Sequence, residues 1–130
     1  MGLEALSRGA EDVVFIEKNP LALRAIKENI ELLNVKELTR IIKGDVIQSL
    51  KKLEKEKLIF DLIYSDPPYG ELLLPLLEWL DQSRLITPNG ILFLESDREI
   101  ERIPLSRLSH KSSRKFGISY LHQYVAKPKV

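Results

Sequence analysis

The segment SDPPYG, residues 65–70, carries the residue types and spacing that point most directly to chemistry. It follows the apolar run FDLIY, residues 60–64, which is typical of a buried strand. Two successive prolines fix φ and remove two backbone donors. The strand must therefore end here, and the carbonyl groups around Asp66 and Pro67 lose their role in a sheet. Asp, Pro and Gly are also ordinary turn residues, so a plain turn is the alternative interpretation.

An acceptor side chain, free carbonyl groups and an aromatic ring at one rigid corner suit a planar amine. The Asp66 carboxylate and the Pro67 carbonyl can accept both hydrogens of an –NH₂ group, which draws the nitrogen lone pair out of conjugation. Tyr69 can stack on the base that carries this amine. The corner is therefore a candidate site for chemistry on the exocyclic amine of a base.

Two further acids fall at the ends of predicted strands. Glu17 closes the run VVFIE, residues 13–17, and Asp45 closes TRIIKGD, residues 39–45. In α/β sheets, ligands lie beyond the carboxyl ends of the strands. Together with Asp66, these acids are expected to point into one crevice, and a solvated acidic rim is the alternative.

The first two of these acids suit an adenosine. The carboxylate of Glu17 can accept hydrogen bonds from two adjacent ribose hydroxyls. Asp45 is placed to accept from an exocyclic amine such as adenine N6, while the neighbouring backbone at Val46 can address the ring. The sequence therefore predicts an adenosine-containing cofactor at this edge of the sheet.

These residues need a sheet to position them, and the pattern of the sequence predicts such a sheet. Asn19 as N-cap and Pro20 at the first helical position start a helix. Strands and helices alternate before a C-terminal antiparallel hairpin, which predicts a single α/β domain, residues 1–130, with right-handed crossovers. The predicted elements are strands at 13–17, 39–45, 60–66 and 91–96, helices at 19–34, 46–57 and 71–86, a turn at 88–90, and a hairpin at 110–127.

Composition narrows the class of protein. The chain has 130 residues, 44% of them hydrophobic and 30% charged, as is usual for a soluble globular domain. It contains no cysteine, which excludes disulfides and thiolate metal sites and is compatible with a cytoplasmic location. Its two histidines are scattered, so no metal site is expected. No apolar run approaches the ~20 residues of a membrane span, so no membrane partner is expected.

The net charge of +1 conceals an uneven distribution. From residue 101 to residue 130 the chain carries seven Lys or Arg and a single acid, Glu101. A basic region of this kind can contact phosphate groups. We take Lys111, Arg114 and Lys115 as candidate nucleic-acid contacts, with a solvated strand face as the alternative.

Four segments of the chain resemble one protein family. SDPPYG is similar to the (D/N/S)-P-P-(Y/F/W) motif of methyltransferases that use S-adenosylmethionine to methylate amines conjugated to a planar system. GLEALSRGA, FIEKN and the late KFG…L..Y hairpin narrow the resemblance to the RsmD-type bacterial 16S ribosomal RNA guanine-N2 methyltransferases. The resemblance covers essentially the whole chain. It implies a Rossmann-like class I methyltransferase sheet with a C-terminal antiparallel hairpin.

The resemblance also implies a reaction and roles for individual residues. A methyl group would pass directly from S-adenosylmethionine to the guanine N2 amine of 16S ribosomal RNA, free or in a small ribosomal subunit particle. The residues Asp66 and Pro67 would orient the amine, and Tyr69 would stack on the base. The cofactor contacts implied are Gly2, Glu17, Asp45, Val46 and Asp66.

One departure from the family's pattern carries its own expectation. Family members have a strand and a Gly-rich turn directly before GLEALSRGA, whereas this chain begins at Met1-Gly2. The sheet is therefore expected to lack its central strand, between the strand that ends at Glu17 and the strand that ends at Asp66, and to self-associate through the gap. An adenine-N6 methyltransferase and an inactive remnant that binds RNA or protein through the basic hairpin are the alternative functions.

Overall fold

The computed structural model describes residues 13–17, 19–65 and 73–128. The predicted site residues Gly2, Asp66, Pro67 and Tyr69 lie outside these ranges. The chain divides into two compact units, Met1–Lys52 and Leu53–Val130, with the boundary inside a helix. We describe each unit separately.

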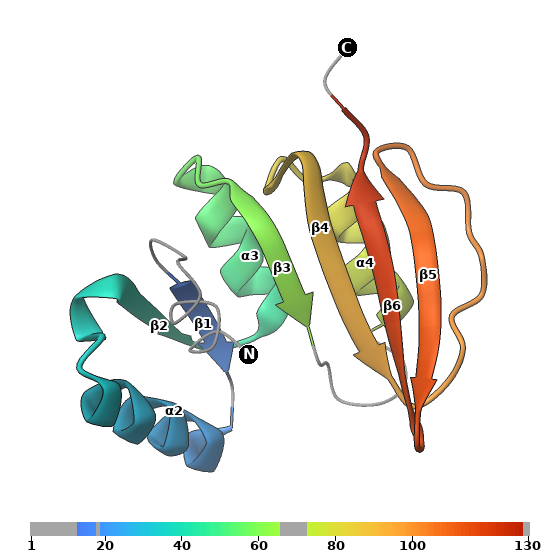
Figure 1. Cartoon of the computed structure of the whole chain (residues 1–130). Coiled ribbons are helices and arrows are strands. Elements are labelled where there is room, and N and C mark those ends of the chain that lie inside the picture. Colours follow the sequence, from blue (N-terminus) through green and yellow to red (C-terminus); the bar gives the residue numbers. More distant parts are fainter. Residues whose placement is uncertain (1–12, 18, 66–72, 129–130) are drawn as a thin grey trace. The chain divides into compact units, whose positions relative to one another are not determined.

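The first unit contains a pair of parallel strands and the helix that connects them (Figure 1). Strand β1 (Val13–Glu17) leads into helix α2 (Pro20–Leu33), and strand β2 (Thr39–Lys43) follows a short 3₁₀ turn, η1 (Lys36–Leu38). Helix α3 (Val46–Lys55) begins in this unit. A parallel pair with a helical crossover is the arrangement that the alternating pattern of the sequence predicts.

Local chemistry sets both ends of α2. The side-chain oxygen of Asn19 accepts hydrogen bonds from the backbone N–H groups of Leu21 (2.8 Å) and Ala22 (3.3 Å), as predicted for the N-cap. Pro20 occupies the first turn, where its missing N–H costs nothing. The helix ends at Asn34, which has a left-handed φ of 56° and whose backbone N–H donates to the Glu31 carbonyl at 3.1 Å.

The second unit is a four-stranded mixed sheet with one helix on its face. The strand order is β3 (Phe60–Ser65), β4 (Ile86–Ser96), β6 (Ser119–Ala126) and β5 (Leu108–Phe116). Strands β3 and β4 are parallel, and β6 runs antiparallel to both β4 and β5, which confirms the predicted C-terminal hairpin.

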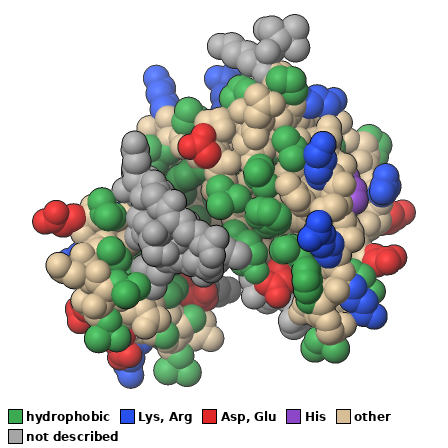
Figure 2. All heavy atoms as spheres, in the orientation of Figure 1, with side chains coloured by type: hydrophobic (Ala, Val, Ile, Leu, Met, Phe, Trp, Pro, Cys, Tyr) green, Lys and Arg blue, Asp and Glu red, His purple; other side chains and the backbone are tan. Residues whose placement is uncertain are grey.

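Helix α4 (Leu73–Gln82) lies behind β4 and β6 in Figure 1 and buries one face of this sheet. Alternate residues of the central strands point toward it and are buried, whereas their neighbours on the opposite face are only half-buried. Figure 2 shows hydrophobic side chains gathered on that opposite face. The core of the unit consists of buried side chains from α4 and the three strands beside it: Leu73, Leu76, Leu77, Leu80, Leu92, Leu94, Leu108, Tyr124 and Ala126.

Two predicted boundaries are wrong. The helix predicted at 71–86 ends at Gln82, and β4 begins at Ile86 instead of after the turn predicted at 88–90. The backbone still bends at the predicted turn, inside the strand. Asn89 has a left-handed φ of 65°, and the register of β4 against β3 shifts at this point. A Cβ atom on Gly90 would lie 2.6 Å from the Ile86 side chain, so only glycine fits where the chain folds back.

The described strands form two sheets, not one. Among the described residues β1 pairs with β2 alone and β3 pairs with β4 alone. This is the position at which the sequence predicts an interrupted sheet, and self-association through it stays a prediction. Within the described part of the chain, no helix has the length and apolar character needed to cross a membrane.

Candidate functional site

The first unit brings two of the predicted acids to one edge. Glu17 is paired with Lys43 in the parallel ladder, and the Gly44 N–H donates to the Glu17 carbonyl at 3.1 Å. Asp45 follows directly, so Glu17 and Asp45 lie at the carboxyl ends of adjacent strands, as predicted. In sheets of this type, this edge is the one that binds ligands.

The Glu17 side chain is tied to the start of the following helix. Its Oε1 atom accepts a hydrogen bond from the Asn19 N–H at 3.0 Å, and the side chain is half-buried. This contact orients the carboxylate at the loop between β1 and α2. A carboxylate carries about four lone-pair sites, so it can accept several hydrogen bonds at once.

Asp45 caps helix α3, a role that the sequence analysis did not assign to it. Its Oδ2 atom accepts from the Gln48 N–H at 3.0 Å, and its carbonyl accepts from Ser49 N–H at 2.9 Å. The first N–H groups of a helix have no intrahelical acceptor, so the Val46 amide is a donor beside this carboxylate. An exposed acceptor next to a backbone donor matches the adenine edge, which offers an N6 donor and an N1 acceptor.

In the second unit, β3 ends at Ser65, directly before the DPPY residues. Ser65 is paired with Leu94 of β4, so the motif departs beside the carboxyl end of a second parallel strand. The Tyr64 hydroxyl donates a short hydrogen bond to the Glu95 carboxylate across these two strands. The sequence analysis missed Glu95, although it is the penultimate residue of ILFLES and so lies near the end of a predicted strand, as the other three acids do.

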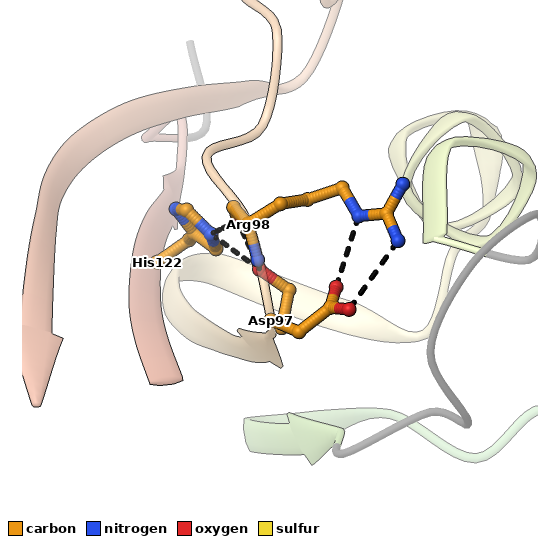
Figure 3. A network of polar contacts seen from close by, with 4 residues as sticks. Asp97, Arg98 and His122 are labelled. Carbon is orange, nitrogen blue, oxygen red and sulfur yellow. Dashed lines mark hydrogen bonds and ion pairs between the residues drawn. The ribbon is translucent and has the colours of Figure 1, made fainter. Parts of the chain in front are cut away.

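Hydrogen bonds to the buried side chain of His122 hold the end of β4 in place (Figure 3). His122 of β6 is fully buried, and its Nε2 atom lies 2.9 Å from the Ser96 Oγ and 3.3 Å from the Arg98 carbonyl. On its other side, His122 Nδ1 lies 2.8 Å from the Ser113 Oγ of β5. Burial lowers the pKa of His122, although the hydrogen bond to Arg98 opposes this effect. The end of β4 is therefore fixed by a neutral imidazole.

The structure divides the predicted phosphate contacts between two faces. Arg114 and Lys115 are paired with Leu121 and Tyr120, so strand alternation sends the two side chains to opposite faces. Lys111 lies at a break in the β5 register, between His110 and Ser112. The Lys115 ammonium lies 5.7 Å from the centre of the Tyr120 ring. The three cations thus share one hairpin without forming a single cluster.

The charged side chains of this hairpin are all positive. Residues 108–126 contain three Lys or Arg and no acid. In Figure 2, Lys and Arg side chains are spread over the side of the molecule formed by β5 and β6. Among the described residues no cluster of acids and histidines could hold a metal ion. The second unit therefore offers a cationic surface, and its described part offers no metal centre.

Comparison with known families identifies the chain. The model of the family described as Conserved hypothetical protein 95 matches residues 1–125. The chain belongs to this family. The resemblance to RsmD-type methyltransferases drawn from four short segments is thereby confirmed.

Several relatives of this family member have curated names. A Bacillus subtilis protein, YlbH, provisionally named as an rRNA methyltransferase, is 32% identical over 102 residues, which is 78% of this chain and 55% of that protein. The Haemophilus influenzae ribosomal RNA small subunit methyltransferase D is 27% identical over 101 residues, 76% of this chain and 52% of that protein. The chain spans about half the length of the curated relatives it matches.

Solved structures show the same fold. A conserved hypothetical protein of Streptococcus pyogenes superimposes with a TM-score of 0.79 at 25% identity, over 96% of this chain and 78% of that protein. An Escherichia coli protein provisionally named as a methyltransferase gives a TM-score of 0.81 at 21% identity, over 98% and 70%. The family member thus has the mixed α/β, Rossmann-like fold of class I methyltransferases with a C-terminal antiparallel hairpin, as predicted.

Proposed function

We propose that this chain transfers a methyl group from S-adenosylmethionine to the exocyclic N2 amine of a guanine in 16S ribosomal RNA. The observation that carries the proposal is the end of β3 at Ser65, where SDPPYG leaves the sheet beside the carboxyl end of β4. The membership of the family and the names of its curated relatives support the same reading. The substrate is 16S ribosomal RNA, free or in the small ribosomal subunit particle.

The residues of the first unit fit the adenosine part of the cofactor. The carboxylate of Glu17 accepts from the ribose hydroxyls. Asp45 accepts from the adenine amine, and the Val46 N–H donates to the adenine ring. When bound, S-adenosylmethionine supplies a methyl group on a sulfonium, which the amine lone pair displaces in line while the electrons of the broken C–S bond pass to sulfur.

The residues of the motif act on the amine. Asp66 and the Pro67 carbonyl accept the two N2 hydrogens, and Tyr69 stacks on the flipped base. This orientation contributes most of the rate, because it holds nucleophile and methyl carbon in line. The N2 proton leaves late, as the amine becomes cationic, so Asp66 need not be a strong base. Gly2 contacts the cofactor from the first segment of the chain.

The proposal is tested by analysing the product nucleoside. Unmethylated 16S ribosomal RNA and small subunit particles are incubated with the full-length protein and labelled S-adenosylmethionine, then digested and separated by mass spectrometry. We expect label in N2-methylguanosine. Label in N6-methyladenosine would support the adenine-specific alternative, and RNA binding without transfer would support the binding-module alternative.

We expect Glu17→Ala to weaken binding of S-adenosylhomocysteine by roughly ten- to a hundredfold, because a charge-assisted contact to two hydroxyls is worth about 1.5–3 kcal/mol. Isothermal titration calorimetry measures the change. Glu17→Gln keeps an acceptor for the Asn19 N–H and should lose most of the same affinity, whereas Glu28→Ala, at an exposed position of α2, should lose none. Equal affinity in all variants would remove Glu17 from the cofactor site.

We expect the basic hairpin to set the salt dependence of RNA binding. Replacing Lys111, Arg114 and Lys115 together by glutamine should flatten the log–log slope of affinity against salt by about two to three units, since each phosphate contact contributes about 0.7–0.9. Fluorescence anisotropy with 16S ribosomal RNA fragments measures the slope.

The two faces of the hairpin can be separated in the same assay. Arg114→Gln and Lys115→Gln alter opposite faces, so the larger single effect identifies the face that meets the RNA. The matched control replaces Lys51, Lys52 and Lys55, three exposed lysines of α3, by glutamine. A hairpin slope no different from this control would leave β5 as an ordinary solvated strand.

A further inference from the structure

The turn of the C-terminal hairpin carries two exposed apolar side chains that the proposed mechanism does not use. Phe116 ends β5 with 59% of its surface exposed, and Ile118, in the turn itself, is 83% exposed. The last residue of β4, Ser96, is paired with Tyr120, so the turn lies past the end of β4, as Figure 1 shows. The turn therefore projects beyond the strand that supports the rest of the hairpin.

The local structure does not require apolar side chains at this turn. Gly117 sets the turn with a φ of 61°, and a Cβ atom on it would meet nothing within 4 Å. Short hairpin turns favour Gly, Asn, Asp and Ser at such positions. Phe116 and Ile118 gain little from burial in the folded chain, because most of the surface of each residue is exposed. Apolar residues that break a local preference without a gain in packing are expected at functional positions.

One face of the hairpin carries an aromatic ring and a guanidinium on the same strand. Arg114 and Phe116 are two residues apart on β5, in a stretch where the register against β6 is regular. Strand alternation therefore directs both side chains to the same face of the sheet. Aromatic rings and guanidinium planes are the groups on which unpaired bases of RNA stack.

The aromatic ring at the end of the other face is already in contact with side chains of this protein. The Tyr120 ring lies parallel to the His122 ring, with the two centroids 6.1 Å apart, and the Lys115 ammonium lies 5.7 Å from its centre. Among the described residues, Phe116 has no ring or cation contact of this kind. Of these two rings, Phe116 is the one available to a ligand.

The charge of the hairpin indicates the class of ligand. Residues 108–126 carry three Lys or Arg and no acid, which favours a polyanion. Proteins that bind single-stranded nucleic acid combine such cations, which contact phosphates, with exposed rings, which stack on bases. We propose that the hairpin turn binds an unpaired stretch of RNA, with Phe116 stacked on one base and Ile118 packed against the same strand. The choice of RNA rests on the proposed function, which this inference deepens by naming residues that contact the substrate.

Fluorescence anisotropy with a single-stranded fragment of 16S ribosomal RNA tests the stacking contact. Phe116→Ala should weaken binding roughly fivefold to a hundredfold, as the loss of one stacked base does, and Ile118→Ser should weaken it by a smaller factor. The same strand annealed to its complement should bind Phe116→Ala and the unaltered protein within about twofold, because paired bases are not exposed for stacking. Ile59→Ala, a matched control with 63% of its surface exposed directly before β3, should change neither affinity.

Two further measurements separate stacking from charge contacts and from loss of folding. The dependence of affinity on salt should be the same in Phe116→Ala and the unaltered protein, because a neutral ring releases no counterions. Phe116→Trp should keep the affinity of the unaltered protein, and its fluorescence should fall when the RNA fragment is added. This signal is read in a Trp79→Phe background, since Trp79 is the single tryptophan of the chain. All variants at position 116 should keep the melting midpoint of their background.

The outcomes distinguish this inference from the proposed function. Equal affinity of Phe116→Ala and Ile59→Ala for the single-stranded fragment would overturn the inference. Weaker binding of Phe116→Ala to the small ribosomal subunit particle alone, with the fragment bound normally, would assign the turn to a protein partner and would also overturn it. If the unaltered protein bound the fragment through Phe116 but transferred no methyl group, the proposed function would fall and the stacking contact would stand.

Discussion

Asp66→Ala is expected to reduce methyl transfer to 16S ribosomal RNA by at least a hundredfold, while affinity for S-adenosylhomocysteine falls much less. The expected loss follows from the role of Asp66 as an acceptor for the target amine. Removing one positioned polar group from a water-excluded site typically costs about 3 kcal/mol or more of transition-state stabilisation. Single-turnover transfer of labelled methyl groups and calorimetry measure the two quantities separately.

The control for Asp66 is Asp61 of β3. Asp61 is exposed, and its carboxylate accepts a hydrogen bond from the Thr87 hydroxyl at 3.2 Å. Asp61→Ala makes the same chemical change five residues earlier in the sequence and should leave transfer within a fewfold of normal. If Asp66→Ala lost cofactor affinity and turnover to the same degree, its role would be structural.

Asp81→Ala is expected to lower the free energy of unfolding by about 2–4 kcal/mol and the melting midpoint by roughly 10 °C. Asp81 lies in the last turn of helix α4, and only 2% of its surface is exposed. Its carboxylate accepts from the backbone N–H groups of Ser106, Arg107 and Leu108, each at 2.8 Å. Removing it leaves three donors without an acceptor where the chain enters β5. Thermal melting followed by circular dichroism measures the change, with Glu78→Ala, exposed on the same helix, as control.

The Asp81 carboxylate also makes the free energy of unfolding depend on pH. Burial alone raises the pKa of Asp81, but the hydrogen bonds from Ser106, Leu108 and Arg107 and the charge of Arg107 together hold it below its usual value. A carboxyl group with a lowered pKa in the folded state stabilises the protein above its unfolded pKa, about 3.9, and loses this contribution as pH falls through the folded pKa. Urea unfolding between pH 6 and pH 2.5 should therefore show a drop that Asp81→Asn largely removes.

The sequence by itself was sufficient to predict those structural features that are set by residues close together in the chain. Asn19 and Pro20 start α2, and the strands end beside Glu17, Asp45 and Ser65 because caps and prolines act within a few residues. The hairpin turns at Gly117, whose φ of 61° is open to glycine at no steric cost. Parallel pairing of β1 and β2 also follows, because a short helix between two apolar runs leaves little other choice.

The tertiary structure was needed to find the ends of some elements and the hydrogen-bond partners that lie far apart in the sequence. The end of α4 at Gln82 reflects Asp81, which is held by backbone groups some 25 residues further along the chain. The position of Lys111 relative to Arg114 depends on a break in register between His110 and Ser112, which no local pattern predicts. The type of a polar residue shows which hydrogen bonds its side chain can form. It does not show which partner a distant strand will supply.

Glu95 shows the difference most clearly. The sequence placed an acid at the end of ILFLES but gave no reason to connect it with Tyr64, 31 residues earlier. Only the parallel register of β3 against β4, with Ser65 beside Leu94, brings this carboxylate within hydrogen-bond reach of the Tyr64 hydroxyl. Residue types determine which hydrogen bonds are chemically possible, whereas strand pairing between distant segments decides which of them form, because register depends on the burial of whole strand faces.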